Sequence, residues 1–179
     1  MERAIKFEIP YDKDIINTIE GFNEITNFCL RVGFESNTFN KNDLHKLTYY
    51  EIRGESDLQS SLVCCARDQA SEMLKREKLK RLPFKKEFSS IRYNQRTFSF
   101  KDGIISLSTI EGRKKIVPNI PKYFSKYLSG EIKSIVIFYK NNRIFGRMIT
   151  EVQTPDKIEV KNVLGIDRGI INPVVTSNN

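Results

Sequence analysis

The stretch from residue 75 to residue 101 combines positive side chains with aromatic rings. Lysine and arginine neutralise phosphates and release counterions, and aromatic faces stack on unpaired bases at about 1–3 kcal/mol per base. Only two acidic residues accompany the ten basic ones. We therefore expect the charges to contact nucleic acid, while for the rings we favour a strand that faces a core. The basic residues are Lys75, Arg76, Lys78, Lys80, Arg81, Lys85, Lys86, Arg92, Arg96 and Lys101, and the aromatic ones are Phe84, Phe88, Tyr93, Phe98 and Phe100.

The positive charge of the chain is concentrated in that stretch. The whole chain has a net charge of +8 and an isoelectric point near 9.4. Residues 1–74 carry a net charge of −5, residues 75–101 carry +8, and residues 102–179 carry +5. A basic segment beside an acidic one indicates a polyanionic partner that binds at a defined place.

A single aspartate stands out near the end of the sequence. Residues 163–175 form an apolar strand that ends in Asp167, a turn at Gly169, and a second apolar strand. Asp156 and Glu159 are close in sequence, but they flank a turn and are expected to be solvated. Asp167 is therefore the carboxylate that the most specific stretch of this sequence singles out.

Other catalytic signatures are missing from the sequence. His45 is the only histidine, no serine or cysteine nucleophile pattern accompanies it, and no glycine-rich phosphate loop is present. We expect His45 at the surface or at a helix cap. Cys29, Cys64 and Cys65 form no C-x-x-C pair, which favours buried thiols over a disulfide or a zinc site.

Three helices are predicted ahead of the basic stretch. After an alternating strand over residues 3–9, Asp12 is positioned to cap a helix that Gly33 ends. A second helix is predicted over residues 42–52, and Gly54 breaks it. Ser56 and Gln59 have the spacing of a capping box for a third helix, which runs into the basic stretch and stops before Pro83.

The rest of the chain has strand periodicity. Residues 97–100 and 104–107 flank an Asp-Gly turn, and residues 133–139 and 144–152 flank an Asn-Asn turn. Another strand is predicted over residues 161–167, whereas residues 116–128 fit neither pattern. The opening strand lies about 85 residues from its expected partners. A sheet or barrel with a helical excursion is the most economical arrangement.

The length of 179 residues allows one compact domain or two small ones. No apolar run approaches the roughly 18 residues that span a bilayer. The start of the sequence lacks the apolar stretch of a secretory signal. These features predict a cytoplasmic protein without a membrane partner.

The motif around Asp167 resembles the first nuclease motif of a RuvC-like ribonuclease-H fold, in the form found in the OrfB/TnpB proteins of insertion sequences. Those proteins are relatives of the type V CRISPR effectors. Weaker similarities occur in the family's order at residues 47–49, 58–62, 82–86, 103–107 and 130–134. The resemblance implies an α+β fold: an oligonucleotide-binding-type barrel interrupted by a helical recognition insert, then the first strands of a RuvC-like domain. Its implied boundaries are 1–10 for the first barrel strand, 11–81 for the insert, 82–160 for the rest of the barrel, and 161–179 for the nuclease start.

The resemblance also implies partners and contacts. A guide RNA and a short DNA motif beside the target would be bound, as part of an RNA-guided DNA endonuclease associated with a transposon. Tyr49 and Gln59 would face the DNA motif, with Tyr93 and Gln95 beside them. The full set of nucleic-acid contacts expected is Tyr49, Gln59, Lys75, Arg76, Lys78, Lys80, Arg81, Lys85, Lys86, Arg92, Tyr93, Gln95 and Arg96.

Asp167 would be one Mg²⁺ ligand of the family's two-metal site, which needs several carboxylates. The sequence ends shortly after this motif, and Arg168 follows the aspartate directly. We therefore expect this chain alone to hold no cofactor and to cut nothing, with possible self-association through its last strands. Two alternatives remain: an inactive remnant that binds DNA or another partner without RNA, and a metal site assembled from several copies.

Overall fold

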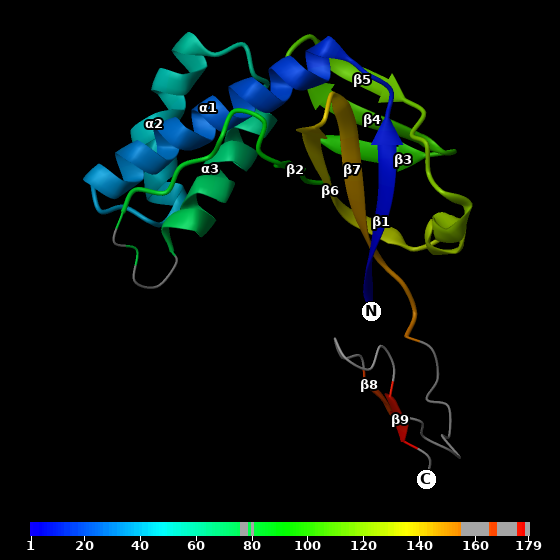
Figure 1. Cartoon of the computed structure of the whole chain (residues 1–179). Coiled ribbons are helices and arrows are strands. Elements are labelled where there is room, and N and C mark those ends of the chain that lie inside the picture. Colours follow the sequence, from blue (N-terminus) through cyan, green and yellow to red (C-terminus); the bar gives the residue numbers. More distant parts are fainter. Residues whose placement is uncertain (76–78, 80, 155–164, 168–174, 178–179) are drawn as a thin grey trace.

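The computed structural model describes residues 1–75, 79, 81–154, 165–167 and 175–177, the last two segments by their backbone alone. Three helices lie to one side of a group of strands (Figure 1). The described strands form antiparallel sheets, so the predicted α+β class is confirmed at that level. No helix in this part of the chain is long and apolar enough to cross a bilayer.

Helix α1 spans Lys13–Glu35 and begins as the sequence predicts. The Asp12 carboxylate accepts hydrogen bonds from the backbone N–H groups of Asp14, at 3.0 Å, and Ile15, at 3.4 Å. The predicted stop at Gly33 is wrong, since the helix continues for two more residues. A Cβ at Gly33 would lie 2.5 Å from Leu74 Cδ1, so this glycine permits close packing of α1 on α3.

Helix α2 spans Lys41–Glu55 and helix α3 spans Ser60–Leu74. Helix α2 runs past Gly54, so the predicted break there is wrong. The predicted capping box is also wrong, because Gln59 makes no side-chain cap bond. The Ser56 hydroxyl instead accepts from the nearby backbone N–H of Leu58 at 3.1 Å, which stabilises the turn between the helices.

The larger sheet has four antiparallel strands in the order β1-β7-β6-β2. These strands span Glu2–Ile9 (β1), Arg143–Glu151 (β7), Glu131–Lys140 (β6) and Ile91–Tyr93 (β2). Strand β1 pairs with β7 along its whole length, from Glu2 opposite Glu151 to Ile9 opposite Ile144. Its partner is therefore much farther along the chain than the predicted 85 residues.

The smaller sheet has the order β3-β4-β5. Its strands span Phe98–Lys101, Ile104–Thr109 and Gly112–Ile116, and a 3-10 helix, η1, follows at Lys122–Tyr127. Both predicted hairpin turns are confirmed by positive φ angles at Asp102, Gly103, Asn141 and Asn142. Among the described residues these two sheets are separate, so the predicted closed barrel is not formed by backbone pairing.

A short hairpin pairs β8, Gly165–Asp167, with β9, Val175–Ser177. Asp167 lies opposite Val175 in this pair. The first part of the strand predicted from residue 161 lies outside the described residues. The predicted self-association through these last strands lies outside them as well.

One apolar core joins the helices to both sheets. The start of α1 is also attached to β5 by charge, since Lys114 Nζ lies 2.8 Å from the Asp12 carboxylate and 3.4 Å from that of Asp14. The hydrogen bond to Asp12 raises the pKa of Lys114. Buried Asp14 also accepts the hydroxyl of Thr109 at 2.6 Å. Helix α1 is thus the element that fixes the helices against the strands.

Candidate nucleic-acid interface

A polar hollow of about 840 Å³ lies between α2, α3 and the turn that joins β2 to β3. We name it the α2–α3 groove. Four basic side chains and one acidic side chain line it, so its electrostatic field favours an anion. The lining residues are Lys41, Asn42, His45, Tyr49, Ser60, Ser61, Cys64, Arg67, Asp68, Asn94, Gln95, Arg96 and Lys133.

Arg67 connects the two helical walls of this groove. Its Nη1 donates to His45 Nδ1 across 2.6 Å, and its Nη2 donates to the Asp68 carboxylate, also at 2.6 Å. Since a guanidinium only donates, His45 Nδ1 accepts and the ring proton resides on Nε2. The Arg67 side chain is only 13% exposed, and these hydrogen bonds fix the position of its guanidinium.

Aromatic rings continue the α2 wall. The rings of His45 and Tyr49 lie 4.4 Å apart between centroids, and Tyr49 meets Tyr50 edge-on at 5.7 Å. Tyr49 is half-buried in the groove, whereas Tyr50 is 83% exposed. A half-buried tyrosine braced by its neighbours presents a ring face and a hydroxyl at low entropic cost, which suits contact with a base or a sugar.

The turn opposite α2 is preorganised by its own side chains. Asn94 Oδ1 accepts from the backbone N–H of Arg96 at 3.0 Å, and Thr97 Oγ1 accepts from that of Asn94 at 2.9 Å. These bonds leave Gln95 and Arg96 exposed at the tip. Glutamine pairs bidentately with adenine and arginine with guanine at the edges exposed in the major groove of DNA. The turn therefore carries two side chains of the types that discriminate bases.

Three of the predicted contact residues, Tyr49, Gln95 and Arg96, line this one groove. Gln59 does not line it, although it directly precedes Ser60 in its wall. Lys75 is the residue directly after α3, and Arg81 and Lys86 are exposed farther along the chain. Arg76, Lys78 and Lys80 lie outside the described residues.

Lys85 does not offer its charge to a ligand in this structure. It is only 6% exposed, and its Nζ donates to the Ser90 carbonyl at 2.7 Å and to Gln69 Oε1 at 3.1 Å. Burial, with a smaller effect of the positive Arg92, lowers the pKa of Lys85 to about 8. Asn27 exchanges two 2.8 Å hydrogen bonds with the backbone of Lys85. This lysine anchors the irregular segment after Pro83 to α1.

Tyr93 and Arg92 are also engaged within the fold. Tyr93 is fully buried, and burial raises the pKa of its hydroxyl well above the usual value. Its ring and that of Phe98 belong to the core and Phe100 packs against it, as we favoured, but Phe84 and Phe88 are exposed, so the expectation is wrong for these two. Arg92 pairs with Glu72 of α3 at 2.5 Å. Counting lysines and arginines in the sequence could not reveal that these residues have partners within the fold.

Sequence analysis did not identify Lys41, Arg67 and Lys133 as site residues. A signal for Arg67 was present, because Ser60, Cys64 and Arg67 follow one another at steps of four and three and so share one helical face. Lys133 lies in a predicted strand, and its approach to the groove depends on pairing between β6 and β2. That pairing is not visible in the local sequence.

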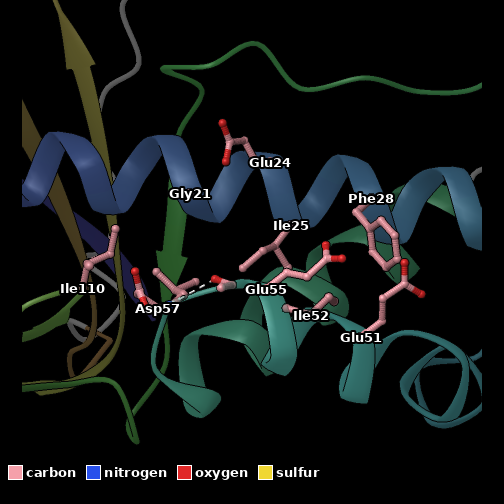
Figure 2. A pocket seen from close by; sticks show the side chains of 11 residues that line it. Gly21, Glu24, Ile25, Phe28, Glu51, Ile52, Glu55, Asp57 and Ile110 are labelled. Carbon is pink, nitrogen blue, oxygen red and sulfur yellow. Dashed lines mark hydrogen bonds between the residues drawn. The ribbon is translucent and has the colours of Figure 1, made fainter.

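A second hollow, of about 320 Å³, lies between α1 and α2 and has the opposite charge (Figure 2). We name it the α1–α2 groove. Glu24, Glu51, Glu55 and Asp57 line it with no basic residue, and none of the four takes part in an ion pair among the described residues. The other lining residues are Gly21, Ile25, Phe28, Ile52, Ser56, Leu58 and Ile110. Its carboxylates repel phosphate.

The described residues contain no group of three or more His, Cys, Asp or Glu side chains that could hold a metal ion. Asp167 ends β8, but its side chain lies outside the described part. The Mg²⁺ site implied for the family therefore stays a prediction. Cys29 and Cys65 are buried as expected, and burial raises the pKa of Cys29 to about 11, so that thiol is not a nucleophile. Cys64 is only half-buried.

No protein-family model and no curated protein matches this sequence. Among solved structures, the chain is similar to Cas12f1, seen by cryo-EM in a complex of Cas12f1 with sgRNA and target DNA. The TM-score is 0.51 at 13% sequence identity. The match covers 99% of this chain and 54% of that chain, so the chain spans about half the length of Cas12f1. At this identity the comparison establishes similarity of fold, extended over nearly all of the chain.

Proposed function

We propose that this chain is the nucleic-acid recognition part of an RNA-guided DNA-targeting protein of the OrfB/TnpB type. The observation that carries the proposal is the α2–α3 groove. It gathers Tyr49, Gln95 and Arg96 from sequence positions up to 47 residues apart and surrounds them with positive charge. The fold shared with Cas12f1, whose solved complex contains sgRNA and target DNA, supports the same conclusion.

In this proposal the groove contacts duplex DNA beside the target. Lys41 and Arg96 neutralise phosphates, which supplies affinity without sequence information, whereas Lys133 is already paired with Glu131 and Glu151. Gln95 and Tyr49 approach base edges and supply the sequence preference. Guide RNA is bound by the exposed positive residues that follow α3, among them Lys75, Arg81 and Lys86.

The finer description of the fold also belongs to the proposal. The two sheets would be the halves of an oligonucleotide-binding-type barrel, α1–α3 would be its recognition insert, and β8–β9 would begin a RuvC-like domain. Asp167 would supply one Mg²⁺ ligand there. We assign the described residues to recognition, and the expectation that this chain alone cuts nothing stays a prediction.

The first test is the nucleic acid that accompanies the protein. The chain is purified at low salt, and the RNA and DNA bound to it are extracted and sequenced. One discrete RNA species is the expected result. Heterogeneous nucleic acid that is lost at moderate salt would instead favour a DNA-binding protein that works without RNA.

The second test addresses the groove. The double variant Gln95→Ala, Arg96→Ala should weaken binding of the chain to duplex DNA and flatten its sequence preference, as measured by fluorescence anisotropy on a library of duplexes. Lys115→Ala, at an exposed position of β5, is the charge control because it lies outside the groove. Lys85 should not be varied in such a test, since its loss would disturb the fold. Equal effects of the double variant and the control would contradict the role of the groove.

A further inference from the structure

One face of the four-stranded sheet carries an ordered pattern of charge and aromatic rings. Strand pairing places Lys6, Arg147, Val136 and Arg92 in one row across β1, β7, β6 and β2. The next row holds Glu8, Phe145 and Phe138. Opposed residues in an antiparallel pair point to the same side, so both rows lie on a single face, which we name the outer sheet face.

The opposite face of this sheet is already used by the core. The intervening row, Phe7, Gly146, Ile137 and Ile91, is buried. Phe7 lies so close over Gly146 that an added Cβ would be 2.1 Å from its ring. On the outer sheet face, by contrast, Lys6 and Arg147 are exposed and the two phenylalanines only half-buried. Packing in the core therefore does not explain the apolar rings on the outer sheet face.

The two rings form an organised unit on the two central strands. The rings of Phe138 and Phe145 stack at 5.6 Å between centroids with 27° between their planes. The guanidinium of Arg147 lies 5.2 Å from the centroid of Phe138, and that of Arg143 lies 5.5 Å from Phe145. Arg143 is also paired with Glu8, which neutralises the acidic residue in the row of the two phenylalanines. The positive charge of the outer sheet face therefore comes from Lys6 and Arg147.

We propose that the outer sheet face binds single-stranded RNA, with unpaired bases stacked at Phe138 and Phe145 and phosphates at Lys6 and Arg147. Aromatic residues on the central strands of an open four-stranded sheet are suited to unstacked bases, because the sheet presents them side by side on a flat support. Charge complementarity selects a polyanion. RNA rather than DNA is inferred because RNA commonly offers unpaired loops, whereas duplex DNA keeps its bases stacked and paired.

Replacing the arginine on a phenylalanine ring by a nucleobase is favourable. An exposed cation–π contact contributes about two- to fivefold to an equilibrium, whereas a base stacked on an aromatic ring contributes about five- to 150-fold. A base can therefore displace Arg147 from Phe138, and the released guanidinium can contact the adjacent phosphate. The cation–π pair keeps the ring covered until the RNA arrives.

This inference adds a site to the proposed function but does not require the α2–α3 groove, since no residue of the two rows lines that groove. The test uses the full chain and a fluorescein-labelled 12-nucleotide oligouridylate. The double variant Phe138→Leu, Phe145→Leu should weaken binding at least tenfold, and Arg147→Ala should weaken it about threefold and reduce its dependence on salt. Tyr123→Leu, at an exposed aromatic residue of η1, is the matched control.

Two further readouts accompany the measurement of RNA affinity. Duplex DNA binding, assigned to the groove, should be unchanged in the phenylalanine variant, so failure at one site does not imply failure at the other. Photo-crosslinking of 4-thiouridine RNA to the unaltered protein should label β6 and β7, a readout independent of whether the variant folds. Unchanged RNA affinity in a folded variant, crosslinks elsewhere, or equally strong binding of the single-stranded DNA of the same sequence would overturn the proposal.

Discussion

The two hollows that flank α2 differ in charge. On one side, Lys41, His45 and Tyr49 belong to the α2–α3 groove, which is lined by four basic side chains and one acidic side chain. On the other side, Glu51 and Glu55 belong to the α1–α2 groove, which is lined by four acidic side chains and no basic one. The buried stripe of Leu44, Thr48 and Ile52 separates the two sets along the same helix.

This difference gives a polyanion one way to approach the helices. A helix with its side chains is about 10 Å wide, which is close to the screening length at 0.1 M salt. A phosphate in the basic groove therefore experiences little repulsion from the acidic one, while a phosphate on the acidic side meets carboxylates directly. Local charge, more than the net charge of +8, should decide where nucleic acid binds.

The largest expected effect follows from reversing charge in the basic groove. The double variant Lys41→Glu, Arg96→Glu should weaken binding of duplex DNA about a hundredfold at low salt, because two phosphate contacts become repulsive. The slope of log affinity against log salt should also become shallower by about two. Fluorescence anisotropy between 50 and 200 mM salt measures both quantities.

The matched experiment reverses charge in the acidic groove. Glu51→Lys, Glu55→Lys should leave the preferred DNA sequence unchanged and raise nonspecific affinity by less than tenfold. Should the two double variants change affinity by similar amounts in opposite directions, net charge alone would govern binding, and the contrast between the grooves would be irrelevant.

A smaller effect is expected from the amide at the β2–β3 turn. Gln95→Ala should cost about 1–3 kcal/mol of binding free energy on the preferred duplex and much less on others, because a base contact is lost but phosphate contacts stay. Competition among duplexes that differ at one base pair measures this. Gln153→Ala, at another exposed glutamine, is the control, and a uniform loss on all sequences would show that Gln95 does not discriminate bases.

On the acidic side we expect a gain of stability without a change in DNA binding. A Cβ at Gly21 would lie an ordinary 3.6 Å from Ile110 Cδ1, so Gly21→Ala should raise the free energy of unfolding by about 0.5–1 kcal/mol through helix propensity. Gly33→Ala is the contrasting variant and should destabilise, since its Cβ would clash with Leu74. Urea unfolding measures both, and a destabilised Gly21→Ala would show that this glycine is required by the fold.

The smallest effect concerns pH. Burial, with the nearby charges of Glu87 and Glu24, raises the pKa of Glu20 above its ordinary 4.5. A raised carboxyl pKa favours the folded state below pH 4.5, and this stability is lost as pH rises through the folded-state pKa. Glu24→Gln should therefore stabilise the protein slightly at pH 7 and not at pH 4, as thermal unfolding at the two values would show. A gain of equal size at both pH values would exclude this cause.

Local sequence rules predicted the parts of the fold that local chemistry determines. Asp12 caps α1, and Asp102-Gly103 and Asn141-Asn142 form hairpin turns, because each of these depends on neighbours in sequence. Strands β2 and β5 were missed. Strand β5 reads Gly-Arg-Lys-Lys-Ile and has almost no apolar alternation, so it forms a strand chiefly by pairing with β4.

Residue type was enough to name Gln95 and Arg96 as candidate contacts, but it could not show which lysines the fold uses internally. Gln95 and Arg96 lie in the groove because a tight turn exposes them. Lys85 and Lys86 are identical neighbours, yet the first is buried on Gln69 and the second is exposed. Only tertiary contacts distinguish them, so counting charges overestimates the number that can contact nucleic acid.

The pairing of β1 with β7 also determines when the larger sheet can form. Glu2 pairs with Glu151, so β1 must wait for β7, the strand of this sheet that is synthesised last. At 5–20 residues per second this delay is roughly 7–30 s. During that time Ile5, Phe7 and Ile9 have no sheet partner, while the three helices can already pack together. The newborn chain should therefore depend on chaperones at its first strand rather than at its helices.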